Sequence, residues 1–318
     1  MKIVITGGCG FLGVGIARKL MDRPEIDSLV LFDAHVPDAL PNGLDDRVTM
    51  VEGDISDRVQ VAAIIDRDDI GVFHLASVVS AGGEQDFDLA MRVNFDGGRH
   101  ILEALRARKG TPRIVLASSL AVFGGPDMPE AVTEMTRVVP QTTYGMTKAI
   151  GELMINDYTR KGFIDGRAAR LPTVIIRPGA PNAAASGFAS GVFREPLSGQ
   201  DYVLPVVMDT RMMVIGARSA IAGLTGLMDA DGEGLGADRV VNLPNNAYAV
   251  TDMIAALERV AAENGITFGP VTPKPDPAIE AIVKSWPLTM EDSRARALGL
   301  PADESLEAII REYIADWL

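Results

Sequence analysis

The sequence has few of the residues from which disulfides and metal sites are built. Its 318 residues include one cysteine, Cys9, and three histidines, His35, His74 and His100. A single cysteine cannot form an internal disulfide, and together with scattered histidines it leaves no set with the spacing of metal ligands. We therefore expect no bound metal. A lone cysteine also favours a reducing compartment, so we expect a cytoplasmic protein.

Positive charge and long apolar runs are scarce as well. The chain has 30 lysines and arginines against 43 aspartates and glutamates, a net charge of −13. This excess disfavours nucleic acid and anionic membranes as partners. No run approaches the roughly twenty apolar residues of a membrane span, and glycine interrupts the first ten residues too early for a signal peptide. We expect a soluble protein whose partner is a small molecule.

Short apolar runs alternate with helical patterns in the first half of the chain. Runs rich in Val, Ile, Leu and Phe predict strands at 2–6, 28–33, 47–53, 71–76 and 113–118, and a sixth strand at 173–178. Helical patterns lie between them, most clearly at 11–23, 56–67 and 86–108. Strands that are apolar throughout are typical of a parallel sheet covered on both faces by crossover helices. The pattern predicts an α/β fold with a Rossmann-type, doubly wound parallel sheet.

The composition changes after Pro178. Residues 179–201 are rich in Gly, Ala, Ser and Pro, and a mixture of shorter elements follows, with a strand at 239–244 and helices at 251–265 and 303–318. We expect a nucleotide-binding domain at 1–178 and a smaller lobe at 179–318 that mainly binds substrate. The chain is expected to cross back between them at least once.

A glycine motif follows the first predicted strand. The run "ITGGCGFLGVGIARKL" places Gly7, Gly10 and Gly13 at the opening of the first helix, where backbone N–H groups can approach a pyrophosphate. Asp33 ends the second strand twenty residues later. A carboxylate there accepts hydrogen bonds from ribose hydroxyls and repels a 2′-phosphate. Because no arginine follows Asp33 closely, the motif predicts NAD rather than NADP. We expect Cys9 to be a small filler in this loop.

Tyr144 and Lys148 stand four residues apart at the start of an apolar helical pattern, in "QTTYGMTKAI". Four residues are about one helical turn, so both side chains leave the same face of the helix. A nearby ammonium lowers the pKa of a phenol. The pair can therefore be a general base and the cation that tunes it. It can equally be two neighbouring surface residues, and the spacing alone does not decide.

Together with the glycine spacing, this pair resembles the extended short-chain dehydrogenase/reductase family, of the NAD-dependent epimerase/dehydratase type. The likeness covers nearly the whole chain. Ser119 stands 25 residues before Tyr144, which is the usual separation in that family. Further landmarks match in order: "GDISD" (53–57), "HLAS" (74–77), "VNFDGGRHILEA" (93–104) and "ASSLAVFG" (117–124). The resemblance implies that Ser119, Tyr144 and Lys148 are catalytic.

The resemblance also implies which residues bind the cofactor and the substrate. Those for NAD are Gly7, Gly10, Phe11, Leu12, Gly13, Asp33, Asp54, Ile55, Ala76, Ser77, Asn94, Tyr144, Lys148 and Pro178. Those for the substrate are Ser80, Ser119, Tyr144, Asn182 and Arg211. Arg211 aligns with an arginine that binds a diphosphate in related nucleotide-sugar epimerases, and a guanidinium suits a carboxylate equally well. A salt bridge is the alternative for Arg211, and Arg218 is a weaker candidate. His74 is interpreted as a core histidine.

A closer resemblance, to the D-erythronate dehydrogenase subfamily, involves "DGRAARLPTVIIRPGAPNAAAS", "REPLSG" and "DPAIEAIVKSWP". That subfamily oxidises a four-carbon sugar acid to its 2-oxo product with a nicotinamide cofactor. The implied function is NAD-dependent oxidation of the C2 hydroxyl of D-erythronate to 2-oxo-tetronate. Tyr144 would be the base, Lys148 would lower its pKa and hold the nicotinamide ribose, and Ser119 would bind the reacting oxygen. Ala180 and Ala183 stand where we expect lysines in that subfamily.

Two other functions share these motifs. One is a nucleotide-sugar epimerase or dehydratase. Ala180, where an asparagine commonly contacts the diphosphate, and Leu120, where dehydratases carry an acid, both count against it. The other is a redox-inactive regulatory protein that binds the cofactor, which the retained serine, tyrosine and lysine disfavour. The helices expected at 86–108 and 143–161 resemble those that pair in dimers of the family, so we expect a homodimer.

Overall fold

A computed structural model describes residues 1–179 and 184–318 of the chain. They form two compact units, which we call unit 1 (1–119, 142–170 and 221–241) and unit 2 (120–141, 171–220 and 242–318). The chain passes between the units after residues 119, 141, 170, 220 and 241. A single boundary after Pro178 therefore does not separate them, and the roles assigned to the two parts remain predictions.

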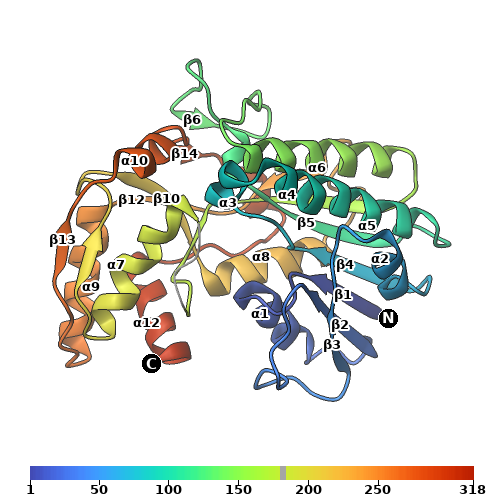
Figure 1. Ribbon diagram of the computed structural model, residues 1–318, viewed down its shortest axis with the longest axis horizontal. Coiled ribbons are helices and arrows are strands. Elements are labelled where there is room, and N and C mark those ends of the chain that lie inside the picture. Colours follow the sequence, from blue (N-terminus) through green and yellow to red (C-terminus); the bar gives the residue numbers. More distant parts are fainter. Residues whose placement is uncertain (180–183) are drawn as a thin grey trace. The chain divides into compact units, whose positions relative to one another are not determined.

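A seven-stranded sheet lies at the centre of unit 1 (Figure 1). Its order is β11, β7, β5, β4, β1, β2, β3, and the pairings among β1 to β5 are parallel. With the first strand central and the chain winding outward on both sides, this is the order of a doubly wound α/β fold, as predicted. The strands are β1 (Lys2–Thr6), β2 (Ser28–Asp33), β3 (Val48–Glu52), β4 (Ile70–His74), β5 (Arg113–Ser119), β7 (Asp165–Leu171) and β11 (Val240–Asn242).

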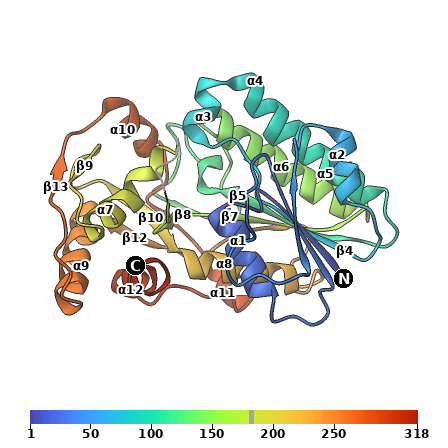
Figure 2. The same cartoon turned by 60° about the horizontal axis from the view of Figure 1, so that its bottom comes forward.

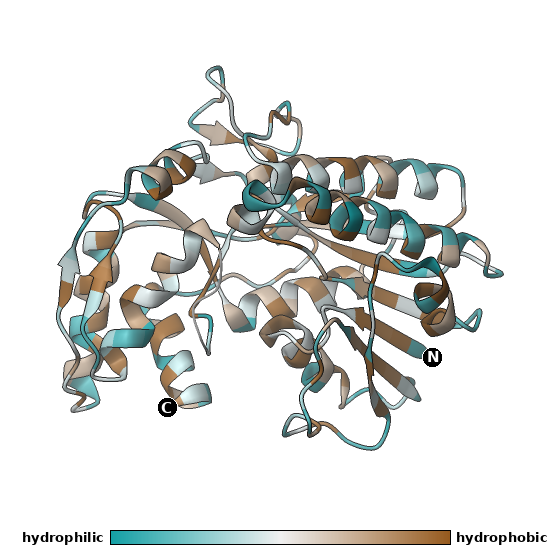
Figure 3. Ribbon diagram, in the orientation of Figure 1, coloured by the Kyte–Doolittle hydropathy of each residue, from teal (hydrophilic) through white to brown (hydrophobic). Residues whose placement is uncertain are grey.

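Helices cover both faces of this sheet. In Figures 1 and 2, α2, α5 and α6 lie on one face, and α1 and α8 on the other. One apolar cluster joins α2, α5 and α6 to the sheet. It contains Val61, Leu105 and Ile155 from these helices and strand residues such as Val4 and Val72. Figure 3 shows the strands mostly in hydrophobic colours, as expected for a sheet buried on both faces. The helices are α1 (Phe11–Leu20), α2 (Arg58–Ile64), α3 (Ser80–Gln85), α4 (Phe87–Ala90), the π-helical η1 (Met91–Asp96), α5 (Gly97–Arg106), α6 (Thr143–Arg160) and α8 (Ala217–Asp229).

The strand predicted at residues 173–178 is present, but it is shorter than predicted and lies outside the large sheet, whose sixth strand is β7. Residues 173–175 form β8 (Thr173–Ile175), which belongs to a sheet of unit 2. The sequence of β7, DGRAARL, has buried arginines: Arg167 pairs with Asp165 at 2.9 Å, and Arg170 with Glu152 at 2.8 Å. A hydropathy pattern cannot detect a strand whose buried positions carry paired charges.

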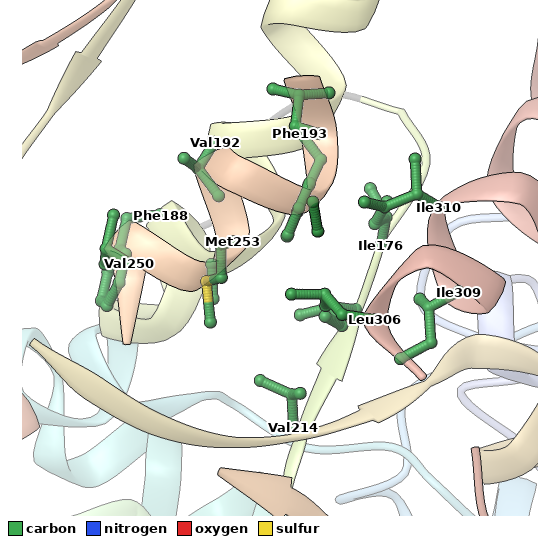
Figure 4. Packing of buried hydrophobic residues seen from close by; sticks show 14 of the residues in the cluster. Ile176, Phe188, Val192, Phe193, Val214, Val250, Met253, Leu306, Ile309 and Ile310 are labelled. Carbon is green, nitrogen blue, oxygen red and sulfur yellow. The ribbon is translucent and has the colours of Figure 1, made fainter. Parts of the chain in front are cut away.

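Unit 2 is built around a three-stranded sheet in the order β12, β10, β8 and the apolar cluster shown in Figure 4. There, Phe193 of α7, Met253 of α9, and Leu306 and Ile310 of α12 belong to one buried cluster. Besides β8, the strands of unit 2 are β6 (Ala131–Val132), β9 (Tyr202–Leu204), β10 (Arg211–Gly216), β12 (Asn246–Ala249), β13 (Val271–Pro273) and β14 (Thr289–Met290). The helices are η2 (Leu120–Val122), η3 (Ala185–Gly187), α7 (Phe188–Leu197), α9 (Val250–Glu263), α10 (Pro277–Lys284), α11 (Ser293–Ala297) and α12 (Leu306–Trp317).

No helix in the described part of the chain has both the length and the apolar character that a membrane span requires.

Candidate active site

A large pocket of about 950 Å³ lies beside the carboxyl ends of β1 to β4 in unit 1. Seven of the residues predicted to bind cofactor line it: Gly7, Gly10, Asp33, Asp54, Ile55, Ala76 and Ser77. The sequence motifs did not point to other lining residues, among them Glu52, Gln60 and Val93. Gln60 accepts a hydrogen bond from the Asp54 amide at 2.9 Å and so holds the loop after β3. No motif marked Gln60, because its role depends on α2 packing beside that loop.

The glycine loop leaves no room for a side chain at Gly7 or at Gly13. Gly7 has a φ of +66°, and a Cβ there would lie 2.9 Å from the Ala76 nitrogen. A Cβ on Gly13 would lie 2.5 Å from the Gly8 carbonyl oxygen. α1 begins at Phe11, followed by Leu12, so the helix N-terminus opens directly after this turn. This arrangement fits a pyrophosphate, which backbone N–H groups and the helix dipole would hold.

Asp33 is fixed at the end of β2 by the same loop. Its Oδ2 accepts a hydrogen bond from the backbone N–H of Cys9 at 3.0 Å. The carboxylate is thus positioned on the pocket wall, where it can accept hydrogen bonds from ribose hydroxyls. Burial, with a smaller contribution from Asp33, raises the pKa of the Cys9 thiol to about 11. The thiol stays protonated, which agrees with a filler role and not with a nucleophile.

Tyr144 and Lys148 lie in the first turns of α6. Thr142 caps this helix by accepting a hydrogen bond from the Gly145 N–H at 3.1 Å. The Lys148 Nζ lies 5.4 Å from the centroid of the Tyr144 ring. Lys148 is only 5% exposed, and this burial lowers its pKa to about 8, while the Glu152 carboxylate opposes the shift. The structure therefore places a buried amine directly beside the phenol, where its cationic form would favour phenolate.

Ser119 ends β5, and a buried network fixes the end of that strand. The hydroxyl of the preceding Ser118 donates a hydrogen bond to Glu152 Oε1 at 2.5 Å. Arg170 of β7 donates two hydrogen bonds to the same carboxylate, at 2.9 and 2.8 Å. Because Glu152 follows Lys148 by one turn of α6, this network couples the strand that carries Ser119 to the helix that carries Lys148.

Asn94, in η1, joins the loop after β4 to α6. Its Oδ1 accepts a hydrogen bond from the Val78 N–H at 2.7 Å, and its Nδ2 donates to Thr147 Oγ1 at 3.1 Å. Asn94 lines a cavity of about 20 Å³ with His74, Thr147 and Lys148, and not the large pocket. His74 is buried, which lowers its pKa to about 3, so the imidazole is neutral.

The other predicted site residues lie in different places. Ser80 is the buried first residue of α3 in unit 1. Pro178 follows β8 in unit 2, and Arg211 is the exposed first residue of β10 in that unit. Asn182, together with Ala180 and Ala183, lies outside the described residues.

Comparison with known proteins identifies the family. The model of the NAD-dependent epimerase/dehydratase family matches residues 3–212. The chain belongs to this family. NAD is the family's cofactor, which the glycine loop and Asp33 fit, and the resemblance inferred from the sequence is confirmed.

Individual relatives of this epimerase/dehydratase chain are similar over its full length. The D-erythronate dehydrogenase of Cupriavidus necator is 45% identical, covering 99% of this chain and 98% of the relative. The D-erythronate dehydrogenase of Haemophilus influenzae is 39% identical, covering 99% of both. The crystal structure of the nucleoside-diphosphate-sugar epimerase from Agrobacterium tumefaciens matches with a TM-score of 0.91 and 37% identity, covering 100% of this chain and 94% of that one.

Proposed function

We propose that this protein is an NAD-dependent dehydrogenase that oxidises the C2 hydroxyl of D-erythronate to the 2-oxo acid. The observation that carries the reaction type is the Lys148 amine, buried and 5.4 Å from the centroid of the Tyr144 ring. The substrate class rests on relatives that are named D-erythronate dehydrogenase at 45% and 39% identity.

The residues of unit 1 fit the cofactor. Backbone N–H groups between Gly7 and Leu12 would bind the pyrophosphate, and Asp33 would bind the adenosine ribose. Asp54 and Ile55, which line the same pocket, would contact the adenine. When bound, NAD supplies the hydride acceptor for the reaction.

Three side chains would carry out the proton chemistry. Tyr144, as phenolate, would accept the proton of the substrate hydroxyl. Lys148 would stabilise that phenolate and hold the nicotinamide ribose, and Ser119 would donate a hydrogen bond to the reacting oxygen as a carbonyl forms. The C2 hydrogen leaves with its electron pair as hydride, so the products are a 2-oxo acid, reduced cofactor and one proton.

An acid substrate needs a cation for its carboxylate, and we propose Arg211 for this role. Arg211 is exposed at the start of β10, and a guanidinium pairs with a carboxylate through two hydrogen bonds. Arg218 is less suitable, because it already forms hydrogen bonds of 2.9 and 2.5 Å with Asp316. Arg211→Met should raise the KM for D-erythronate at least tenfold with little change in the KM for NAD. Arg218→Met serves as the control, and equal effects of the two variants would contradict the assignment.

The test of the proposed function is NADH formation at 340 nm with NAD and D-erythronate, its stereoisomers and a panel of UDP-sugars. We expect turnover with the four-carbon acid and its loss by at least 10³-fold in Tyr144→Phe, which lacks the base. Tyr158→Phe is the matched control, since Tyr158 lies on the same helix and its hydroxyl bonds Glu103. Cofactor binding without any turnover would indicate the regulatory protein instead.

A nucleotide-sugar epimerase is the second candidate. The observation that favours it is the similarity to the nucleoside-diphosphate-sugar epimerase from Agrobacterium tumefaciens, with 37% identity and a TM-score of 0.91. An epimerase would isomerise a UDP-sugar without net NADH formation. That result, with no oxidation of any four-carbon acid, would replace the dehydrogenase proposal.

We also propose that the protein is a cytoplasmic homodimer. The location rests on the single cysteine. Apolar side chains are exposed on the helices expected to pair: Leu153 of α6 is 66% exposed and Phe87 of α4 is 55% exposed. Light scattering on protein eluted from a size-exclusion column should give twice the chain mass of 33.8 kDa. Leu153→Glu should shift the measured mass toward that of the monomer. A monomer mass for the unmodified chain would contradict this proposal.

A further inference from the structure

His74 and Lys148 line the same small cavity of unit 1, although they come from β4 and α6. They are 4% and 5% exposed. The cavity measures about 20 Å³, which is room for one water molecule, and Asn94 and Thr147 supply its remaining polar lining. A site of this size with several polar groups is one in which a buried water is stable.

The hydrogen bonds of Thr6 orient the imidazole of His74. Thr6 Oγ1 accepts a hydrogen bond from the Ala76 N–H at 3.3 Å and lies 2.7 Å from His74 Nδ1. We assign the Thr6 hydroxyl as the donor to Nδ1, because this gives its proton a partner. The ring proton of the neutral histidine is then on Nε2. Nε2 points toward the cavity, because a Cβ placed on Gly98, another lining residue, would lie 3.4 Å from it.

Titratable groups approach Lys148 from its own helix and from β4. On its own helix, Tyr144 lies one turn before it and Glu152 one turn after, and the Glu152 carboxylate also accepts hydrogen bonds from Arg170. His74 is the titratable group that faces Lys148 from β4. A water that accepts the Nε2–H of His74 keeps an oxygen lone pair for the ammonium.

We infer that His74 is a positioning residue for Lys148 and acts through one water molecule held in this cavity. The inference rests on the proposed function only for the role of Lys148 beside Tyr144. A hydrogen bond to a charged group is worth about one pKa unit, so loss of the water should lower the pKa of Lys148 by about one unit. Less positive charge beside Tyr144 would then raise the pKa of the phenol, and the acidic limb of kcat/KM would move to higher pH.

Two variants remove the water in different ways. His74→Leu removes the donor, and Gly98→Ala keeps His74 but places a methyl group beside its Nε2. His74→Gln is the conservative variant, since its amide N–H can replace Nε2–H. Ile114→Val alters an apolar part of the cavity wall and is the packing control.

The first readout is the pH titration of the Lys148 Cε resonance in protein labelled with ¹³C-lysine, assigned by its loss in Lys148→Met. We expect the pKa of Lys148 to fall by about one unit in His74→Leu and Gly98→Ala, and to stay unchanged in His74→Gln and Ile114→Val. The second readout is the pH profile of kcat/KM, whose acidic limb should move upward in the first two variants only.

An unchanged Lys148 titration in folded Gly98→Ala would overturn the inference, even if His74→Leu fails to fold. A high-resolution crystal structure with no ordered water between His74 and Lys148 would do the same. The NMR titration needs no substrate. If the protein does not oxidise D-erythronate, the proposed function fails but the NMR test of His74 still stands. If the enzyme is active and the pKa of Lys148 is the same in all variants, only the role of His74 is rejected.

Discussion

The environment of Lys148 disfavours its charged form. Its side chain is 5% exposed, and burial brings its pKa from 10.5 to about 8, with Glu152 acting in the opposite direction. The folded state therefore binds the Lys148 proton less tightly than the unfolded chain does. A cation kept inside the protein in this way is typical of a functional site and not of a site selected for stability.

Lys148→Met should stabilise the protein while abolishing its activity. Because the folded pKa lies below the unfolded one, the destabilisation is fully present below about pH 8 and disappears as the pH rises toward 10.5. The shift corresponds to about 3 kcal/mol at pH 7. Urea unfolding at pH 7 and at pH 10 measures this effect. The free energy of unfolding of the variant should exceed that of the wild type at pH 7, and the difference should be smaller at pH 10. A variant less stable than wild type at pH 7 would contradict this.

Asp33 should decide between the two nicotinamide cofactors. Asp33→Ser removes the carboxylate that accepts from ribose hydroxyls and repels a 2′-phosphate. We expect the ratio of kcat/KM for NAD to that for NADP to fall by about tenfold or more, since a charge-assisted hydrogen bond and a like-charge repulsion are both lost. Steady-state kinetics with both cofactors checks this. Asp54→Ser is the control on the neighbouring pocket wall, and it should leave the ratio nearer to wild type.

At the scale of elements, Glu152 ties α6 to β5 and β7. Ser118 and Arg170 both bond its carboxylate, and all three side chains are buried. This network sets the register between the strand end that carries Ser119 and the helix that carries Tyr144 and Lys148. In the proposed function these three residues carry out the chemistry, and a rigid support would keep them within the narrow geometry that catalysis needs.

Glu152→Ala should destabilise the protein by about 3–5 kcal/mol, because it leaves the buried Arg170 charge without its carboxylate. The double variant Glu152→Met, Arg170→Met should recover part of that loss, since no charge is then buried. Asp157→Ala is the matched control on the same helix: its partner Arg160 is exposed, so the cost should stay below about 1 kcal/mol. Chemical denaturation measures all three, and equal losses for Glu152→Ala and Asp157→Ala would show that the network is not structural.

At the scale of the whole molecule, cofactor binding should be coupled to stability. The large pocket belongs to unit 1 and is formed by loops that follow four of its strands. A ligand that binds only the folded state stabilises it by mass action. Because the Asp33 carboxylate is expected to repel the 2′-phosphate of NADP, the stabilisation should be larger for NAD than for NADP.

With NAD at one hundred times its Kd, we expect a stabilisation of about 2.7 kcal/mol. Thermal unfolding monitored by fluorescence should show a higher Tm with NAD, and a smaller rise with the same concentration of NADP. Asp33→Ser should reduce the NAD effect, whereas the Ile114→Val control should retain it. Equal shifts with both cofactors would contradict the assignment of Asp33.

Features encoded by neighbouring residues could be predicted from the sequence. The strands β1 to β5 follow from runs of apolar residues, because a strand buried on both faces needs them at consecutive positions. The glycine loop and Asp33 follow from short motifs with a steric or electrostatic reason. The proximity of Tyr144 and Lys148 follows from one helical turn, and the sequence resemblance pointed to the family that the comparisons confirm.

Features that join distant parts of the chain became evident in the folded protein alone. The hydrogen bond between Thr6 and His74 spans 68 positions, and that between Ser118 and Glu152 spans 34. β7 was missed because its buried arginine, Arg170, is acceptable only beside a carboxylate from another element. Burial and charge pairing depend on which elements pack together, and no local pattern contains that information. For the same reason, the cavity that His74 shares with Lys148 became visible only in the folded chain.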